Sequence, residues 1–497
     1  MLDGPSLRQV KPISRFTEKP LSAGQTFVKE LPKMINNFPA DFKWGVATSS
    51  YQIEGATNKD GRGVSIWDTF AATPGKVVNG ETGDLACDHY HLFKEDIALM
   101  KKLGVQTYRF SIAWPRLFPQ GDKVREQRGF DFYNRLIDEL IANGIEPMAT
   151  LYHWDLPQTL QDRGGWANRE IVDHFVDYAT SAVEAFGDRV SNWITINEPW
   201  CVSWLGYMLG VHAPGVQNLD HAIAASHHTA LAHGLATRAM RNVNPNFKIG
   251  IAPNMTNYRV DDPSNPELME LSGLMDSHIN RWWIEAFTHG QYPKNLADFY
   301  GERLQKYVLP GDMESLKVQT DFLGINYYSD SFIGTPRPED KPMSEGGLFP
   351  FPQRSNGTPP EPHTDMGWPI TPNGMRDLLV RVAKDWPSIK EIAITENGAA
   401  YPEGPDENGE VQDHRRVEFL ESHIEAVGQA ISEGAPVKRY YAWSFMDNYE
   451  WAEGYAKRFG IVHVDFDTMK RTPKESAKVL SSIIHSHSSF WETVSQS

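Results

Sequence analysis

The segment that decides the fold spans residues 193–199 and reads WITINEP. It is a short run of aromatic and β-branched residues that ends in an amide and a carboxylate, Asn197 and Glu198, immediately before Pro199. A run of this kind is typical of a strand that is buried on both faces, as in a parallel sheet. Two polar side chains at its carboxyl end are unexpected unless the strand ends in a functional site.

A near repeat of this segment lies in the C-terminal third of the chain. Residues 392–398 read IAITENG and predict a second buried strand, which delivers Glu396 at its carboxyl end. Two buried strands that each end in a glutamate provide the pair of carboxylates that a two-carboxylate hydrolase requires. Glu198 and Glu396 are therefore the first candidates for catalytic residues.

The rest of the chain alternates between strand-like and helix-like patterns. Strands are predicted at residues 42–47, 107–111, 146–152, 193–198, 248–252, 322–328, 392–396 and 440–444. Helices are predicted at residues 91–103, 131–142, 169–186, 219–243, 414–432 and 474–484. Eight strands that alternate with helices indicate parallel pairing through right-handed crossovers.

An open doubly wound sheet would usually carry a glycine-rich phosphate turn, and none follows these strands. The sequence therefore predicts an α/β protein with a (β/α)8 TIM barrel, whose catalytic groups lie at the carboxyl ends of the strands. Residues 37–490 are expected to form this single catalytic domain. Residues 1–36 are expected to be an N-terminal extension, poorly structured or packed on the surface. The inserts at 72–87 and 335–373 are expected over the barrel mouth.

Composition limits the possible partners. The chain has 497 residues and a formal net charge of −16, which argues against nucleic acid and anionic membranes. No apolar run approaches the ~18 residues of a membrane span, and prolines interrupt residues 1–36, so no signal peptide is recognised. The sequence predicts a cytoplasmic protein without a nucleic-acid or membrane partner, as a monomer or a homo-oligomer.

No cofactor and no metal are expected. Cys87 and Cys201 are interpreted as reduced thiols, because neither has a neighbouring histidine that would suggest a catalytic role. His227, His228 and His233 share one predicted helix, but they lack a metal-binding spacing with a supporting glutamate.

Polar and aromatic residues lie on seven of the predicted strands or in the loops directly after them. They are Gln52, Glu54, Arg109, His153, Trp154, Asp155, Asn197, Glu198, Asn326, Tyr327, Tyr328, Glu396, Trp443, Asp447, Asn448, Tyr449, Glu450 and Trp451. Amides, carboxylates and imidazole bind hydroxyls, while the apolar face of a sugar stacks on indole. Each side chain alone has an ordinary structural explanation, but their convergence at seven strand ends predicts a carbohydrate site.

The chemistry of retaining glycosidases assigns a role to each carboxylate. In these enzymes the two groups lie ~5–5.5 Å apart across the scissile bond. Glu396 is predicted to be the nucleophile, kept ionised by Arg109 and the Tyr328 hydroxyl. Glu198 is predicted to be the acid/base, with a pKa raised by the other carboxylate. Asn197 is expected to hold the sugar 2-hydroxyl.

The two glutamate-bearing segments, residues 193–199 and 392–398, belong to a larger set of motifs. The others are FKWGVAT (42–48), YQIEG (51–55), YRFSIAW (108–114), YHWDLP (152–157), WSFMDNYEW (443–451) and RFG (458–460). Together they resemble the signatures of glycoside hydrolase family 1, the β-glucosidases, over residues 38–484. The resemblance implies a cofactor-free barrel enzyme that hydrolyses terminal β-D-glucosides, with cello-oligosaccharides among its small-molecule partners.

The resemblance also implies sugar-binding roles. Gln52, Glu450 and Trp451 would bind the 3-, 4- and 6-hydroxyls of the non-reducing sugar, and His153 its 3-hydroxyl. Asn197 and Asn326 would line the same subsite. Trp443 would form its floor, Phe459 would close it, and Trp368 would be the aglycone platform. Residues 366–372 depart from the family pattern, which usually has an acidic residue and an aromatic after the tryptophan.

Three other kinds of protein fit these residues less well than a β-glucosidase does. Family members that act on 6-phospho sugars carry a serine, with lysine and tyrosine nearby, where this chain has Glu450 and Trp451; a carboxylate there would repel phosphate. A non-catalytic carbohydrate-binding protein would have no reason to keep two opposed glutamates. A Schiff-base aldolase needs a lysine inside the barrel, but Lys248 and Lys438 lie at strand starts. β-Galactosides and β-fucosides remain plausible substrates.

Overall fold

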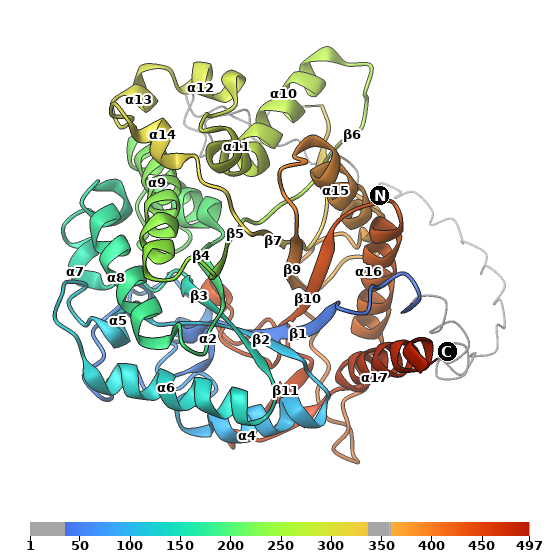
Figure 1. The fold of residues 1–497 in the computed structure, drawn as a ribbon. Coiled ribbons are helices and arrows are strands. Elements are labelled where there is room, and N and C mark those ends of the chain that lie inside the picture. Colours follow the sequence, from blue (N-terminus) through green and yellow to red (C-terminus); the bar gives the residue numbers. More distant parts are fainter. Residues whose placement is uncertain (1–34, 336–356, 358, 497) are drawn as a thin grey trace, which may run out of the picture.

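A closed barrel of eight parallel strands forms the centre of the protein (Figure 1). The computed structural model describes residues 35–335, 357 and 359–496. The strand order around the barrel is β1-β10-β9-β7-β5-β4-β3-β2, so neighbours in space are neighbours in the predicted strand sequence. The prediction of a (β/α)8 barrel is confirmed.

The barrel strands lie where the sequence places them. Their bounds are β1 Lys43–Ala47, β2 Thr107–Ser111, β3 Glu146–Tyr152, β4 Asn192–Asn197, β5 Lys248–Ala252, β7 Phe322–Asn326, β9 Ile392–Asn397 and β10 Val437–Trp443. Two short pairs lie outside the barrel. They are β6 (Tyr258–Val260) with β8 (Ser331–Ile333), and β11 (Val462–Val464) with β12 (Arg471–Pro473).

The longer helices surround the barrel (Figure 1). They are α4 His89–Lys102, α6 Gln127–Ala142, α8 Ile171–Phe186, α9 Leu219–Val243, α15 Pro372–Asp385, α16 His414–Ser432 and α17 Glu475–Gln496. Shorter helices are α2 Ser50–Ile53, α3 Ile66–Ala71, α5 Trp114–Leu117, α7 Gln158–Gln161, α10 Pro266–Asp276, α11 Trp282–His289, α12 Lys294–Tyr300, α13 Glu302–Gln305 and α14 Asp312–Leu316. A π-helical segment, Cys201–Leu209, follows β4.

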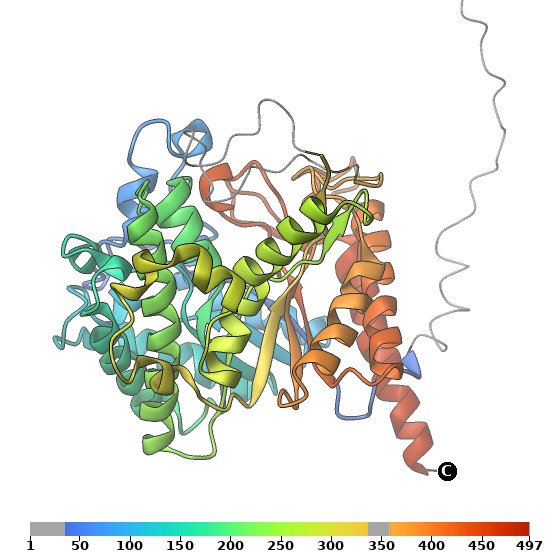
Figure 2. The ribbon, with the colours of Figure 1, turned by 90° about the horizontal axis from the view of Figure 1, so that it is seen from above.

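Two helix predictions are corrected at their ends. Helix α6 begins at Gln127 rather than 131, because the Glu126 side chain caps it by accepting from the Arg128 amide at 3.2 Å. Helix α17 does not end at 484 but continues to Gln496, and its end extends beyond the other helices in Figure 2. The indole of Trp491 anchors the added turns by donating to the Phe38 carbonyl at 3.1 Å.

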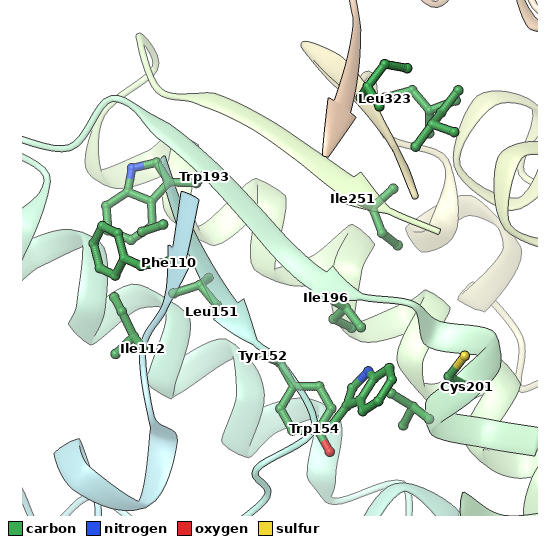
Figure 3. Packing of buried hydrophobic residues seen from close by; sticks show 14 of the residues in the cluster. Phe110, Ile112, Leu151, Tyr152, Trp154, Trp193, Ile196, Cys201, Ile251 and Leu323 are labelled. Carbon is green, nitrogen blue, oxygen red and sulfur yellow. The ribbon is translucent and has the colours of Figure 1, made fainter. Parts of the chain in front are cut away.

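The barrel interior is a packed core. One cluster takes side chains from seven different strands, which only the inside of the barrel can bring together. Its members are Ala47, Met148, Ile194, Ala252, Phe322, Ala393, Tyr441 and Trp443, with Ala400 and Phe459 from the loops. The alternate side chains of the same strands, such as Trp193 next to Ile194, belong to the layer between strands and helices. Figure 3 shows part of that layer, with Phe110, Leu151 and Trp193 on neighbouring strands.

The predicted flanking segments are described only in part. Residues 1–34 of the predicted extension lie outside the described residues, but Ile35 is buried in the core. Residues 336–356 and 358 of the second insert also lie outside them. In the first insert, Glu81 accepts from the Tyr455 amide at 2.6 Å, so this insert contacts the loop that follows β10. Among the helices in the described part of the chain, none is long and apolar enough to cross a membrane.

Candidate active site

A cavity of about 810 Å³ opens at the carboxyl ends of the barrel strands. It brings together most of the predicted site. The predicted residues that line it are His153, Trp154, Asn197, Glu198, Asn326, Tyr328, Trp368, Glu396, Trp443, Glu450, Trp451 and Phe459. Arg109 and Gln52 are fully buried behind this lining.

Glu396 is held by two donors at the end of β9. Arg109 donates from Nη1 to Oε1 of Glu396 at 2.7 Å, and the Tyr328 hydroxyl donates to Oε2 at 2.6 Å. Both predicted contacts are therefore present. Burial raises the pKa of Glu396 above its ordinary value, and the Arg109 charge and the Tyr328 hydrogen bond limit that rise.

Glu198 has a different environment at the end of β4. Asn326 donates from Nδ2 to Oε1 of Glu198 at 2.8 Å, and the Cys201 thiol lies 3.2 Å from Oε2. Burial, and next the charge of Glu396, raise the pKa of Glu198 to about 8. Within the described residues Arg109 forms an ion pair with Glu396 and none with Glu198. Glu198 therefore has only uncharged hydrogen-bond partners among the described residues, whereas Glu396 is paired with a cation.

A chain of amides fixes the geometry between the two glutamates. The side-chain oxygen of Asn197 accepts from Arg109 Nη2 at 2.6 Å and from Asn326 Nδ2 at 2.9 Å. The side-chain oxygen of Asn326 accepts in turn from the Thr395 hydroxyl at 2.6 Å. These contacts set the orientation of both amides, because each oxygen faces only donors.

His153 presents an unused donor. The Asn197 amide donates to His153 Nε2 at 3.1 Å, so the proton of the neutral ring lies on Nδ1. Burial, and next the nearby Arg109 charge, lower the pKa of His153, which keeps the ring neutral. Nδ1 is buried and has no protein partner among the described residues. A ligand hydroxyl is the kind of group that would satisfy it.

Aromatic rings form one wall of the cavity. The His153 ring stacks against Trp443 and Trp451, with centroid distances of 5.7 and 5.9 Å. Trp154 packs on Trp451 at 4.5 Å and donates its indole N–H to the Asn197 carbonyl at 3.0 Å. Trp154, Glu198 and Trp451 all have left-handed backbone conformations, with φ of 78°, 45° and 51°. Such conformations are uncommon for these residue types and concentrate at functional sites.

Glu450 and Gln52 lie together on another side of the cavity. Gln52 Nε2 lies 3.4 Å from Oε2 of Glu450, and it also donates to the Tyr449 carbonyl at 2.8 Å. Burial and the charges of Glu396 and Glu198 raise the pKa of Glu450 to about 8. The predicted carboxyl group at this position therefore lies in the cavity lining, and its environment raises its pKa.

Trp368, Tyr328 and Phe459 form the outer side of the cavity. The Trp368 ring lies 5.2 Å from Tyr328 and 6.1 Å from Phe459. This places the predicted platform next to the hydroxyl that contacts Glu396, despite the unusual residues that follow Trp368.

Sequence reasoning missed part of the lining. Asn254, Met255 and Thr256 line the cavity directly after β5, and Cys201 lines it after β4. The rule that functional groups follow barrel strands would have found residues 254–256, since strand 248–252 is predicted correctly.

Three acidic residues at predicted strand ends have structural partners instead. Glu54 pairs with Arg116 at 2.9 Å, and the Ser50 hydroxyl donates to Asp155 at 2.7 Å. Asp447 pairs with Lys474 at 2.7 Å and with Arg458 at 2.8 Å. None of the three lines the cavity in the described structure.

Two buried carboxylates with different hydrogen-bond partners, facing one cavity lined by amides and indoles, define a glycoside hydrolase site on a (β/α)8 barrel. Comparison with known proteins agrees. The family model for glycosyl hydrolase family 1 matches residues 34–489, and the chain belongs to that family.

Individual relatives are similar over nearly their full length. Beta-glucosidase A of Acetivibrio thermocellus is 44% identical over 88% of this chain and 96% of its own. The 1,4-beta-D-glucan glucohydrolase of Thermotoga neapolitana is 43% identical over 90% and 98%. The solved structure of the Thermotoga maritima β-glucosidase in complex with deoxynojirimycin has a TM-score of 0.83 and 43% identity, covering 90% of this chain and 99% of that one.

Proposed function

We propose that the protein is a retaining β-glucosidase that hydrolyses terminal, non-reducing β-D-glucosyl residues by double displacement. The observation that carries the proposal is the unequal environment of two buried glutamates. Glu396 contacts a guanidinium and a phenol, whereas Glu198 contacts an amide and a thiol. The names of the family relatives support the same activity.

In the first step Glu396 attacks the anomeric carbon and Glu198 gives its proton to the departing glycosidic oxygen. The bond from carbon to the leaving oxygen breaks as the glucosyl ester of Glu396 forms. The raised pKa of Glu198, about 8, suits this role because the group is protonated at neutral pH. Arg109 and Tyr328 hold Glu396 in place and favour its ionised form.

In the second step Glu198 is the base. Formation of the ester removes the negative charge of Glu396, and with it one cause of the raised pKa of Glu198. Glu198 then takes a proton from water as the water oxygen bonds to the anomeric carbon, and the bond from that carbon to Glu396 breaks to release glucose and the Glu396 carboxylate. Configuration is retained because two displacements occur on opposite faces of the sugar.

The sugar-binding roles are proposed from the cavity geometry and the family pattern. Nδ1 of His153, which has no partner among the described residues, donates to a sugar hydroxyl, and Trp443 stacks beneath the sugar ring from its place in the cavity lining. Gln52, Glu450 and Trp451 bind the hydroxyls farthest from the scissile bond, and Asn197 holds the 2-hydroxyl. Trp368 supports the aglycone. β-Glucosides with a second glucose as leaving group are proposed substrates, since one relative is named a 1,4-beta-D-glucan glucohydrolase. An intracellular location remains a prediction.

A 6-phospho-β-glucosidase is the nearest alternative. Burial of a phosphate beside Glu450 is unfavourable, because the nearby groups are acidic or amide and the Arg109 charge is engaged by Glu396. The test is a comparison of kcat/KM for p-nitrophenyl β-glucoside and its 6-phosphate. We expect turnover of the free sugar, and a preference for the phosphate would refute this assignment of Glu450.

A further inference from the structure

The cavity holds a thiol next to the acid/base carboxyl. Cys201 is the third residue after Glu198, and the Val202 amide donates to the Glu198 carbonyl at 3.1 Å, so a helical turn joins them. Residues three apart in such a turn lie on the same face. The turn places Sγ of Cys201 3.2 Å from Oε2 of Glu198, within the cavity lining.

The two oxygens of Glu198 have different partners. Oε1 accepts an amide N–H from Asn326 at 2.8 Å. In the part of the chain that the structure describes, the Cys201 thiol is the single hydrogen-bond partner of Oε2. A strong donor at Oε1 leaves Oε2 as the oxygen that carries the exchangeable proton, since a protonated Oε1 would face the Asn326 N–H.

We propose that Cys201 is a positioning residue for the acid/base. Its thiol donates a hydrogen bond to Oε2 when Glu198 is ionised, and it does not donate to Oε2 when that oxygen carries the acid proton. The proposal rests on the proposed function of Glu198. Burial and the neighbouring glutamates raise the pKa of Cys201 well above its ordinary value, so the group is a thiol and not a thiolate.

A thiol suits this position better than a hydroxyl would. The S–H group is a weak donor and sulfur a weak acceptor. It can therefore orient Oε2 without competing with the glycosidic oxygen for the proton in the first step, or with water in the second. A serine would bind Oε2 more strongly and favour the ionised form of Glu198.

Other charges also act on Glu198. Glu396 on β9, Glu450 after β10, Arg109 on β2 and the Tyr328 hydroxyl after β7 face it. All four are unchanged in variants of Cys201, so a shift in the titration of Glu198 in such variants reports on the thiol.

The test compares Cys201→Ser and Cys201→Ala by the pH dependence of kcat/KM on p-nitrophenyl β-glucoside. We expect the alkaline limb to move down by about half a pH unit in the serine variant and up by a similar amount in the alanine variant. Cys87→Ala is the control, because Cys87 lies outside the cavity lining and donates to the Asp447 carbonyl. Unmoved limbs, or shifts in the same direction, would overturn the proposal.

A second measurement does not depend on the stability of the Cys201 variants. The chain has two cysteines, so Cys87→Ala leaves Cys201 as its single thiol. Its S–H stretching band in the infrared should move to lower frequency as Glu198 ionises across pH 7 to 9, and should not move in the Glu198→Gln background. A band that is insensitive to pH would also overturn the proposal. Absence of turnover by the wild-type protein would instead refute the proposed function.

Discussion

The Tyr328 hydroxyl lies 2.6 Å from Oε2 of Glu396 and donates to it. It is one of two donors that favour the ionised form of Glu396 against the effect of burial, the other being Arg109. Arg109 lies on β2 and Tyr328 lies in the loop after β7, so the closure of the barrel brings both donors to the end of β9.

Replacing Tyr328 with phenylalanine removes that hydrogen bond and preserves the ring. The pKa of Glu396 should rise, so the acid limb of kcat/KM should move to higher pH, and kcat should fall by roughly 100-fold. The measurement is the pH profile on p-nitrophenyl β-glucoside. Tyr300→Phe is the matched control, because its hydroxyl contacts His278 Nδ1 at 3.1 Å and it does not line the cavity. An unchanged acid limb would contradict the proposed role of Tyr328.

Glu198→Ala should affect substrates according to their leaving groups. A p-nitrophenolate leaves without protonation, whereas an alkoxide needs the proton of Glu198. We expect formation of the glucosyl-enzyme from p-nitrophenyl β-glucoside to persist, with a burst of nitrophenol before slow hydrolysis. Turnover of methyl β-glucoside should be lost. Equal losses on both substrates, measured as kcat/KM, would exclude Glu198 as the acid.

In the wild-type protein the alkaline limb of the pH profile of kcat/KM should lie near pH 8. Glu198 must be protonated in the free enzyme, and its pKa is raised to about 8 by burial and by Glu396. Activity should therefore fall as pH rises through that value. A limb near pH 5, where an ordinary exposed glutamate would place it, would show that Glu198 lacks the predicted environment.

The raised pKa of Glu450 predicts that binding of glucose 6-phosphate relative to glucose depends on pH. Its pKa is raised to about 8, so the carboxyl becomes negative as pH rises through this value. The ratio of the inhibition constants of glucose 6-phosphate and glucose should increase between pH 6.5 and 9. In Glu450→Gln this ratio should be independent of pH after correction for the ionisation of the phosphate. The same slope in both proteins would contradict the assignment.

The buried pair of Lys474 and Asp447 predicts an effect on stability rather than on chemistry. The two groups lie 2.7 Å apart and are both fully buried. Lys474→Met leaves Arg458 as the ion-pair partner of Asp447 among the described residues, and should cost about 3–5 kcal/mol of unfolding free energy. Lys294→Met, which breaks the exposed pair with Asp298, should change stability far less. Equal losses in urea denaturation would refute this comparison.

Much of this structure could be predicted from sequence because the barrel repeats a simple pattern. Apolar runs such as 193–199 and 392–398 specify their strands locally. In a closed parallel barrel the carboxyl ends of all strands lie on the same face. Glu198 and Glu396 could be placed in one site on that basis alone, and so could Arg109.

Other features depend on contacts that local patterns do not encode. The extent of α17 follows from the packing of Trp491 on Phe38, which are far apart in the chain. The raised pKa of Glu450 depends first on its burial and then on how closely β9, β4 and the loop after β10 bring three carboxyl groups together. The contact of Cys201 with Glu198 depends on the turn that follows Pro199.

The assignment of the two glutamates is tested most directly by azide rescue. Azide should replace the missing nucleophile in Glu396→Ala and attack the face opposite to the leaving group, so that α-glucosyl azide forms. In Glu198→Ala it should attack the glucosyl ester of Glu396, which yields β-glucosyl azide. Proton NMR of the two products distinguishes the anomers. The α product from Glu396→Ala and the β product from Glu198→Ala are the predicted result; the reverse pairing would contradict the assignment.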